Sequence, residues 1–379
     1  MPLTTPAWPM STGRVSTRPP FSGGDAPIDR SVPYSRDLVD SYIPNESSLL
    51  PPALARQLRA AAFWQEPLPF ATQGTRVMQE FLIDLSWSSS RLEGNSYSRQ
   101  ATVALFECPI TSMPDPASLS TDALMLFNHR NAIELLVRHA RPWGLTRRLV
   151  EELHGALMWR LLGDPGSVGR LRNHPVEITC STYKPCPIPA VLHEMLDHIV
   201  AKASVTRNPV EAAFFLWVHL AYLQGFADGN RRTSRLSANV PLLLGNCAPL
   251  TFIDVDRSDY AAAMVAVYER RDFSIAVDLF EWLYRRSMRR YLSLIETGPA
   301  PDPRAIRYYH PLAAAMRAIV IDRKSAAAAV AEQRLPAAEV AGFTEFLHEE
   351  IAALHESNGA VFRLSHELIV SWIASGRPH

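Results

Sequence analysis

The 379-residue sequence has few cysteines and no net charge, and these deficits exclude several classes of protein. Four cysteines are too few for a disulfide scaffold, and none of them form the C-x-x-C spacing of a zinc module. Lys+Arg and Asp+Glu number 38 each, so the chain lacks the basic surplus that marks nucleic-acid-binding proteins and membrane-surface proteins. No apolar run approaches the roughly 18 residues of a membrane span. We therefore expect neither nucleic acid nor a membrane among its partners.

The N-terminus also lacks a charged region followed by an apolar core, so no secretory signal is indicated and a cytoplasmic location is expected. Residues 1–33 hold seven prolines separated by Ser, Thr and Gly. Such a composition buries too little apolar surface to offset the cost of ordering, and it predicts a disordered leader over residues 1–36. The first acidic residue is Asp25, which leaves a transit peptide as the alternative.

What the sequence does contain is helical periodicity, which predicts an all-α fold. Apolar residues recur at helical spacing from about 37 to 160, and further helices are expected over 259–296. The one strand candidate, 175–183, reads PVEITCSTY and is followed by three prolines, which favours a short hairpin or flap. A proline-rich joint at 299–303 precedes an Ala-rich helical tail at 304–379.

Residues 211–223, EAAFFLWVHLAYL, are apolar on nearly every side, which predicts a helix buried all round. His219 lies within it and is expected to be a core histidine with its hydrogen bonds satisfied. The polar loop Asp228-Gly229-Asn230 ends this pattern. A second helix is predicted from about Arg231 to Leu244, ending at Gly245.

The segment Gln224–Arg235, QGFADGNRRTSR, holds the residues best suited to chemistry. Asn230 can cap the second helix, and Gly229 lets the backbone approach a ligand closely. The free N–H groups at a helix start form an anion site. Three arginines in or beside the first turn oppose the helix dipole and favour a phosphate partner; these are Arg231, Arg232 and Arg235. Asp228 could hold a phosphate-bridging magnesium ion. A capped helix whose arginines pair with surface carboxylates remains the alternative.

This segment resembles the signature of Fic proteins, H-P-F-x-[D/E]-G-N-G-R-x-x-R, with its spacing intact. The matching residues are Phe226, Asp228, Gly229, Asn230, Arg232 and Arg235. A second stretch, SSRLEGN at 89–95, resembles the [S/T]-x-x-x-E-[G/N] motif of the inhibitory helix in class II members, through Ser89, Glu93 and Gly94. The resemblance covers about residues 80–295. It implies an N-terminal helical region with the inhibitory helix over 37–120 and a Fic core over 121–297.

The resemblance implies a helical Fic/Fido core with a small β-hairpin flap, and transfer of AMP from ATP to a hydroxyl of a target protein. The target would dock on the flap near 175–189. Asp228 would bind Mg²⁺, while Asn230 and the 229–231 backbone would form the anion hole. Arg232 and Arg235 would contact the outer phosphates. Glu93 would pair with Arg235 and hold the γ-phosphate in a position unfit for transfer.

Three positions depart from this pattern. The family's catalytic histidine aligns with Gln224, whose amide can orient a hydroxyl but cannot accept its proton. Gly225 replaces a proline. Arg231 replaces a glycine and can crowd the α-phosphate, as a lysine does at this place in the Doc branch, which transfers phosphate. Glutamine and a cation at these positions also resemble a bacterial subgroup of the family.

Three functions remain open from the sequence. The first is a nucleotide-binding Fic protein with weak or absent AMP transfer, a candidate pseudoenzyme autoinhibited by Glu93. The second is an active nucleotidyl- or phosphotransferase of altered chemistry, because phosphoryl transfer depends largely on positioning and charge. The third is a non-catalytic interaction module whose arginines are structural. The sequence leaves a homo-oligomer open.

Overall fold

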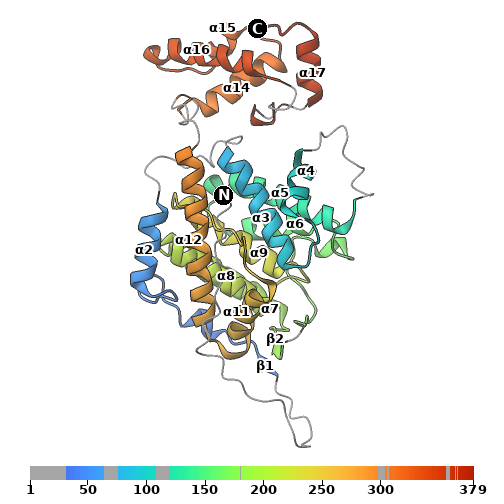
Figure 1. Cartoon of the computed structure of the whole chain (residues 1–379), viewed down its shortest axis with the longest axis vertical. Helices are drawn as coiled ribbons and strands as arrows, with labels where there is room; N and C mark the ends of the chain where they lie inside the picture. The colour runs from blue at the N-terminus through green and yellow to red at the C-terminus, as the bar shows by residue number, and fades with distance from the viewer. Residues whose placement is uncertain are drawn as a thin grey trace, which may run out of the picture. The chain divides into compact units, whose positions relative to one another are not determined.

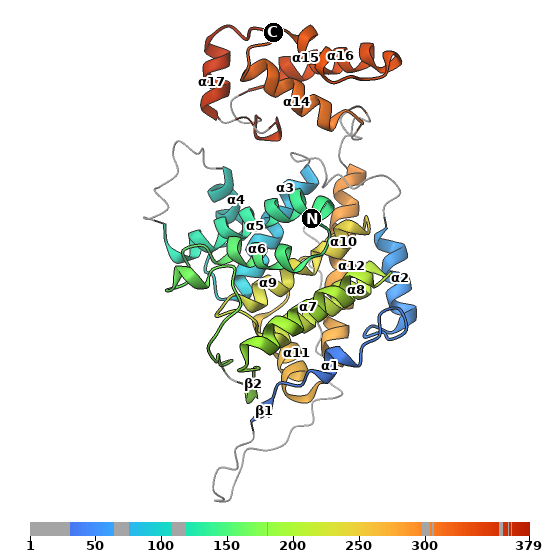
Figure 2. The ribbon, with the colours of Figure 1, turned by 180° about the vertical axis from the view of Figure 1, so that it is seen from behind.

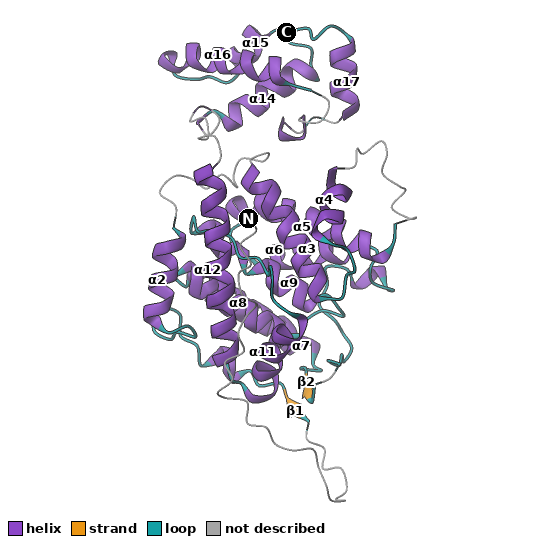
Figure 3. Cartoon of the chain, viewed as in Figure 1, coloured by secondary structure: helices purple, strands orange, loops and turns teal. Residues whose placement is uncertain are grey.

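The computed structural model describes residues 31–63, 76–107, 119–179, 181–297, 304, 307–355, 359–362, 364 and 366–379. Most of the predicted leader, 1–30, lies outside the described residues. Helices dominate the described chain, and Figure 3 shows strand only at the two short segments β1 and β2. The predicted all-α class is confirmed. None of the described helices is long and apolar enough to cross a membrane.

The chain divides into two compact units. The first comprises Met1–Leu68, Phe81–Cys108 and Ser112–Tyr291, and the second comprises Pro69–Glu80, Pro109–Thr111 and Leu292–His379. The first part of the chain contains β1 (Val32–Pro33), α1 (Asp37–Asp40), α2 (Pro52–Ala62), α3 (Arg76–Leu92), α4 (Arg99–Glu107), α5 (Thr121–Trp143), α6 (Arg147–Met158) and the 3₁₀ turn η3 (Pro165–Ser167). Then follow β2 (Tyr183–Lys184), α7 (Pro189–Val205), α8 (Pro209–Leu223), α9 (Asn230–Ser237), α10 (Asn239–Leu244), α11 (Arg257–Arg270) and α12 (Ser274–Thr297).

Helix α8 is the centre of the first unit. All fifteen of its residues are buried, as its sequence predicts. It packs against α2, α7, α9, α10 and α11, which surround it in Figures 1 and 2. Asn208 begins the helix, because its side chain accepts a hydrogen bond from the Val210 N–H. A helix enclosed in this way fixes the position of the loop that follows it.

The predicted second helix is divided into α9 and α10. Both are buried along most of their length, and α10 ends at Gly245 as expected. Pro241 lies in α10 and has no N–H to donate to the preceding turn, which accounts for the break near Ala238.

The small sheet differs in its pairing from the expected hairpin. Strand β2 pairs in parallel with β1, with Val32 opposite Tyr183 and Pro33 opposite Lys184. On its other side the chain turns back at Ile178, whose carbonyl accepts from the Ser181 N–H at 3.2 Å. The ladder partner of β2 thus comes from 151 residues earlier in the chain, a pairing that local sequence cannot reveal.

The second unit has a hydrophobic core of its own. It contains α14 (Tyr309–Val320), α15 (Ala326–Glu332), α16 (Ala337–Ala353), the 3₁₀ turn η4 (Gly359–Phe362) and α17 (His366–Ala374). Phe343, Phe346, Leu347, Ile369 and Trp372 are all nearly inaccessible to solvent in this core. The predicted helical tail is therefore a folded element with its own packing.

Candidate functional site

The signature loop begins where α8 ends, at Gln224. This residue closes the helix in the left-handed conformation, with φ of 51°. Its side chain is buried and donates from Nε2 to the Ala221 carbonyl at 2.6 Å. Its own carbonyl accepts from Arg172 Nε at 2.7 Å. The amide expected at the position of the family's histidine is therefore engaged in closing the helix.

Asn230 fixes the shape of the loop. Its Oδ1 accepts from the Phe226 N–H at 2.8 Å, while its Nδ2 donates to the Phe226 carbonyl at 2.9 Å. The prediction that Asn230 caps α9 is wrong, because Gly229 occupies the N-cap position and no side chain caps the helix. Gly229 has φ of 73°, and a Cβ there would lie 2.5 Å from Met158 Sδ. The loop thus requires glycine both for its conformation and for space.

His154 supports the loop from α6. Its ring stacks on Phe226 with the ring centres 3.9 Å apart. Nδ1 accepts from the Gly169 N–H at 3.0 Å, so Nε2 carries the proton that is donated to the Asp228 carbonyl at 3.1 Å. Burial lowers the pKa of His154 to about 4. This neutral imidazole fixes the backbone of Asp228, and thereby the position of its carboxylate.

Arg235 is enclosed by protein. Its Nε donates to Ser89 Oγ at 2.9 Å, and its Nη2 donates to the Ser89 carbonyl at 3.0 Å. The guanidinium lies over the rings of Tyr260 and Phe252 at 5.1 and 5.8 Å. A cation buried to this degree requires a counter-charge.

Glu93 supplies that charge and joins two arginines. Oε1 accepts from Arg235 Nη2 and Oε2 accepts from Arg231 Nη2, each at 2.7 Å. Burial opposes ionisation of this carboxyl, but the adjacent guanidinium groups of Arg235 and Arg231 outweigh it and lower the pKa of Glu93 to about 2. The sequence predicts the contact with Arg235, and the structure places Arg231 in the same cluster.

The Glu93 side of this cluster is held by the end of α3. Gly94 follows Glu93 in the left-handed region with φ of 95°, and the Asn95 N–H reaches back to the Ser90 carbonyl at 3.1 Å. Ser89 Oγ lies 3.0 Å from His129 Nε2. Burial lowers the pKa of His129 to about 3, so its ring is neutral and Nε2 accepts a hydrogen bond from the Ser89 hydroxyl. The same hydroxyl oxygen accepts a hydrogen bond from Arg235 Nε.

Arg232 and Asp228 differ from this paired cluster. The Arg232 side chain is buried, and its Nε and Nη1 have no hydrogen-bond partner among the described residues. Its Nη2 lies 3.4 Å from Asp228 Oδ2. The Asp228 side chain is 67% exposed. A buried guanidinium with two unpaired donor nitrogens can bind an anion, and the accessible carboxylate beside it can bind a cation. Together they suit an anionic ligand that is complexed with a metal ion.

The same residues fit Mg²⁺ with a triphosphate better than a protein-only metal site. The described residues contain no group of three or more His, Cys, Asp or Glu placed to hold a metal. Asp228 is a single accessible carboxylate, and Mg²⁺ characteristically combines one or two carboxylates with substrate phosphates.

The flap is tied to the loop by Arg172, which sequence reasoning missed. Besides Gln224, its guanidinium donates to the carbonyls of His174 and Cys186, both at 2.7 Å. The Tyr183 hydroxyl donates to the Tyr222 carbonyl at 2.6 Å. Both ends of the flap are therefore bonded to the end of α8.

His219 is buried in the core as predicted, but neither ring nitrogen has a partner among the described residues, so the expected hydrogen bonds are missing. Burial lowers its pKa to about 3. Its place inside the central helix keeps it away from the loop chemistry.

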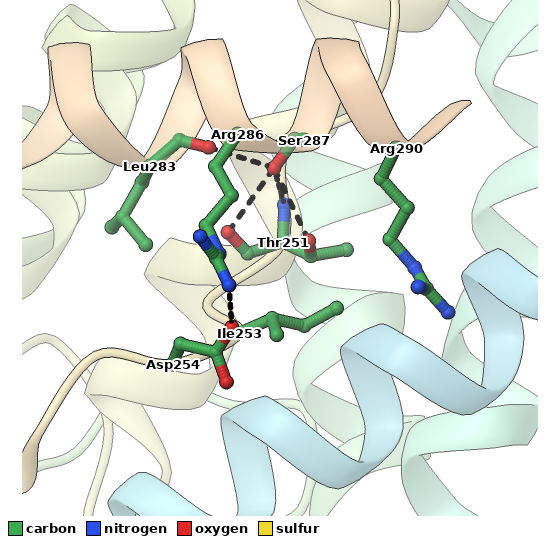
Figure 4. Close-up of a pocket in the computed structure, with 7 residues that line it drawn as sticks. All are labelled: Thr251, Ile253, Asp254, Leu283, Arg286, Ser287 and Arg290. Atoms are coloured by element: carbon green, nitrogen blue, oxygen red, sulfur yellow. Dashed lines mark hydrogen bonds and ion pairs between the residues drawn. The ribbon is translucent and has the colours of Figure 1, made fainter. Parts of the chain in front are cut away.

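A small pocket of about 140 Å³ lies between the segment 251–254 and α12 (Figure 4). Its walls are Thr251, Ile253, Asp254, Leu283, Arg286, Ser287 and Arg290. Ser287 Oγ accepts from the Thr251 N–H at 3.0 Å, and Arg286 is paired with Asp254. These bonds fix the segment that carries Phe252, and with it one wall around Arg235.

Comparison with known proteins finds a family domain in this part of the chain. Residues 144–242 match the model of the Fic/DOC family, a range that contains the loop, α8 and the flap. The chain therefore contains a Fic-family domain. A protein adenylyltransferase Fic of Nematostella vectensis is 25% identical over 191 residues, and a protein adenylyltransferase fic-1 of Caenorhabditis elegans is 29% identical over 142 residues.

These matches cover 49% and 37% of this chain but only 43% and 28% of the relatives, so the chain spans less than half the length of either. Among solved structures, a Fic family protein of Desulfovibrio desulfuricans aligns with a TM-score of 0.54 and 18% identity over 73% of this chain and 82% of its own. A Fic-domain signalling protein of Bacteroides thetaiotaomicron aligns with a TM-score of 0.51 and 18% identity over 66% and 99%. Both likenesses concern the fold.

The supporting residues carry little signal in the sequence. Arg172 and His154 lie in predicted helical or flap regions without a motif, and the contacts that join them to the loop are to the distant carbonyls of Gln224 and Asp228. The family model spans both positions, so comparison with relatives was the signal that could have marked them.

Proposed function

We propose that this chain binds ATP or a related nucleotide together with Mg²⁺ at the loop 228–235. The observation that carries the proposal is Arg232, a buried guanidinium whose Nε and Nη1 are unpaired in the described chain. Leaving such donors without an acceptor is costly, and phosphate oxygens at the start of α9 would satisfy them. Mg²⁺ held by Asp228 would neutralise phosphate charge.

Glu93 is the autoinhibitory residue in this proposal, in the manner of class II Fic proteins. It neutralises Arg231 and Arg235, both 2.7 Å away, so a triphosphate must compete with it for these cations. Ser89 binds the same Arg235, and Gly94 ends this turn next to Glu93 in the left-handed conformation. Removing the carboxylate should therefore tighten nucleotide binding.

AMP transfer to a protein target is proposed to be weak or absent. Gln224 cannot accept the proton of an attacking hydroxyl, and general bases contribute about 10²- to 10⁴-fold to such reactions. Its side chain is also bonded to the Ala221 carbonyl. The chain would then act as a nucleotide-responsive protein, with its target docked on the flap.

Calorimetric titration with ATP, ADP and GTP in the presence of Mg²⁺ tests this function. Wild type should bind at least one of these nucleotides. Glu93→Gly should bind the same nucleotide about tenfold more tightly, because its phosphates no longer compete with a carboxylate for Arg231 and Arg235. Arg232→Gln should lose binding. Arg148→Gln, at an arginine that is 73% exposed on α6, is the matched control and should bind as wild type does.

Absence of binding in both wild type and Glu93→Gly would overturn the proposal and favour an interaction module. The retained contact between Glu93 and the arginines supports a second candidate, an active transferase of altered chemistry, because an inhibitor implies an activity. Transfer of a label from ATP by Glu93→Gly would establish this candidate, and no transfer by that variant would exclude it.

A further inference from the structure

The only strand partner of β2 within the described residues is the chain's own N-terminal segment. Two backbone hydrogen bonds join them, from the Val32 N–H to the Thr182 carbonyl and from the Tyr34 N–H to the Lys184 carbonyl, both at 3.0 Å. This is the geometry by which an extended peptide adds to a sheet edge. Because the ladder covers only two residue pairs, it is short enough to be exchanged.

Pro33 makes this segment a terminal strand. The N–H groups of its two neighbours point to β2, so the nitrogen of residue 33 points away from the sheet. A proline in that position has no donor to offer a third strand. The segment therefore covers the edge of β2 and prevents further growth of the sheet.

Tyr34 seats the segment, but its fit is incomplete. Its ring lies against Tyr222 at a centre-to-centre distance of 5.2 Å, and the Ser35 N–H donates to the Tyr222 hydroxyl at 3.0 Å. The hydroxyl of Tyr34 itself is buried and has no partner among the described residues. An unsatisfied buried hydroxyl weakens the contact that contains it.

The chain immediately after this segment is firmly attached. Lys202 Nζ donates to three carbonyls in this region, those of Val39, Asp40 and Tyr42, at 2.6 to 3.0 Å. Arg36 Nη2 pairs with Glu194 Oε1 at 2.8 Å. The short tether gives residues 32–35 a high effective concentration at β2, even though their own contacts are few.

The covered edge adjoins the candidate nucleotide site. Tyr183 of β2 donates to the Tyr222 carbonyl, two residues before Gln224, and Arg172 bonds both Gln224 and the far end of the flap. An extended peptide on this edge would thus be held beside the loop that the proposed function assigns to the nucleotide.

The proposed function already places the target on the flap; we propose that residues 32–35 occupy the edge of β2 at Thr182–Lys184 as an internal competitor of that target. The partner would be an extended protein segment running parallel to β2, with an aromatic residue at the position of Tyr34. This inference rests on the proposed function for its biological purpose, but peptide docking itself requires no nucleotide.

The probe is a fluorescein-labelled peptide of residues 29–37, DRSVPYSRD, titrated without nucleotide onto full-length chains. Val32→Pro with Tyr34→Gly removes one backbone donor and the aromatic anchor, and we expect it to bind the probe at least about tenfold more tightly than wild type. Val32→Ala keeps the N–H and should bind as wild type does. A probe carrying an N-methyl group on Tyr34 should not bind.

Equal binding of the probe to wild type and the double variant, or binding to neither, overturns the proposal.

Hydrogen exchange of wild type provides a measurement that does not depend on folding of the variant. Excess probe should speed exchange of the Val32 and Tyr34 amides, and unchanged exchange contradicts displacement. Tyr34→Phe removes the unsatisfied hydroxyl and should slow exchange of the residue 34 amide by about fivefold. The probe is titrated without nucleotide, so a negative result in the peptide experiment does not affect the proposed nucleotide binding, and the reverse also holds.

Discussion

At the scale of single residues, Glu93 is a buried carboxyl that forms two ion pairs. Burial favours its neutral form, whereas the two arginines favour its charged form. Its pKa falls from 4.5 to about 2 because the attraction of Arg235 and Arg231 exceeds the cost of burial. A carboxyl with a lowered pKa stabilises the fold fully above its unfolded value. That contribution is lost as the pH falls from about 4.5 through 2.

Glu93→Gln should therefore cost about 3 kcal/mol of unfolding free energy at pH 7, because Arg235 keeps a buried charge without its counter-ion. The difference from wild type should shrink as the pH is lowered toward 2. Urea unfolding of both proteins at pH 7 and pH 3 measures it. Glu152→Gln, at a 47% exposed carboxylate, should show little change at either pH. A pH-independent difference would contradict the assigned pKa.

Gly229 is constrained in two ways. Its φ of 73° disfavours any side chain, and a Cβ would lie 2.5 Å from Met158 Sδ. Gly229→Ala should lower stability by about 1–3 kcal/mol and weaken nucleotide binding. Thermal unfolding and calorimetry measure the two effects. Gly163→Ala, where no atom lies within 4 Å of the added Cβ, is the control. Unaltered nucleotide affinity in Gly229→Ala would argue against a ligand at this turn.

Gln224→His alone should restore no strong AMP transfer. The new ring would supply a base, but Arg231 remains where the family has glycine, and Glu93 still holds the arginines. Label transfer from ATP to added protein substrate is the measurement. Transfer should become measurable only when Arg231→Gly and Glu93→Gly are added. Robust transfer by the single variant would show that the histidine alone is missing.

At the scale of elements, Glu211 in the first turn of α8 holds the segment between α1 and α2. Its carboxylate accepts from the N–H groups of Leu49 and Leu50 at 2.7 and 3.0 Å. The hydroxyls of Tyr42 and Ser48 lie 3.2 Å from the same carboxylate. The central helix therefore positions the N-terminal segment as well as the loop at its other end.

Glu211→Gln should destabilise the protein by about 2–3 kcal/mol, because an amide NH₂ would face backbone N–H donors. Exchange of the Leu49 and Leu50 amides should accelerate more than that of α8 itself. Hydrogen exchange with mass spectrometry measures both. Glu134→Gln removes a partly exposed i,i+4 pair with Arg130 and should change stability by less than about 0.5 kcal/mol. Uniform acceleration across the chain would refute the local role.

At the scale of the whole molecule, each of the two compact units has its own interior. The buried core described for the second unit runs from Tyr308 to Trp372, and Trp372 is fully buried in it. Its indole N–H donates to the Pro378 carbonyl at 3.2 Å. The nucleotide site, by contrast, is assembled entirely from residues of the first unit.

Trp372→Ala should lower the stability of the second unit by about 3–5 kcal/mol and leave nucleotide affinity unchanged. Scanning calorimetry should then show two transitions, of which only one moves. Val370→Ala, at a 37% exposed position in the same helix, should leave both in place. A loss of nucleotide binding in Trp372→Ala would show that the two interiors are energetically coupled.

The sequence predicts those features that depend on local pattern. The apolar run at 211–223 defines a buried helix, and Gly245 marks the end of α10, because periodicity and glycine act over a few residues. The contact of Glu93 with Arg235 follows only from resemblance to a family. Capping preference predicts Asn230 as a helix cap because it takes no account of the alternative partner, the Phe226 backbone.

The sequence by itself therefore determines the helical class, the central helix and the order of charges in the loop. Tertiary structure alone decided that Arg231 shares Glu93 with Arg235, that His154 and Arg172 support the loop, and that residues 32–34 pair with β2. These contacts join residues 52 to 151 positions apart, and their formation depends on the packing of helices around α8. No local pattern encodes a distance of that kind.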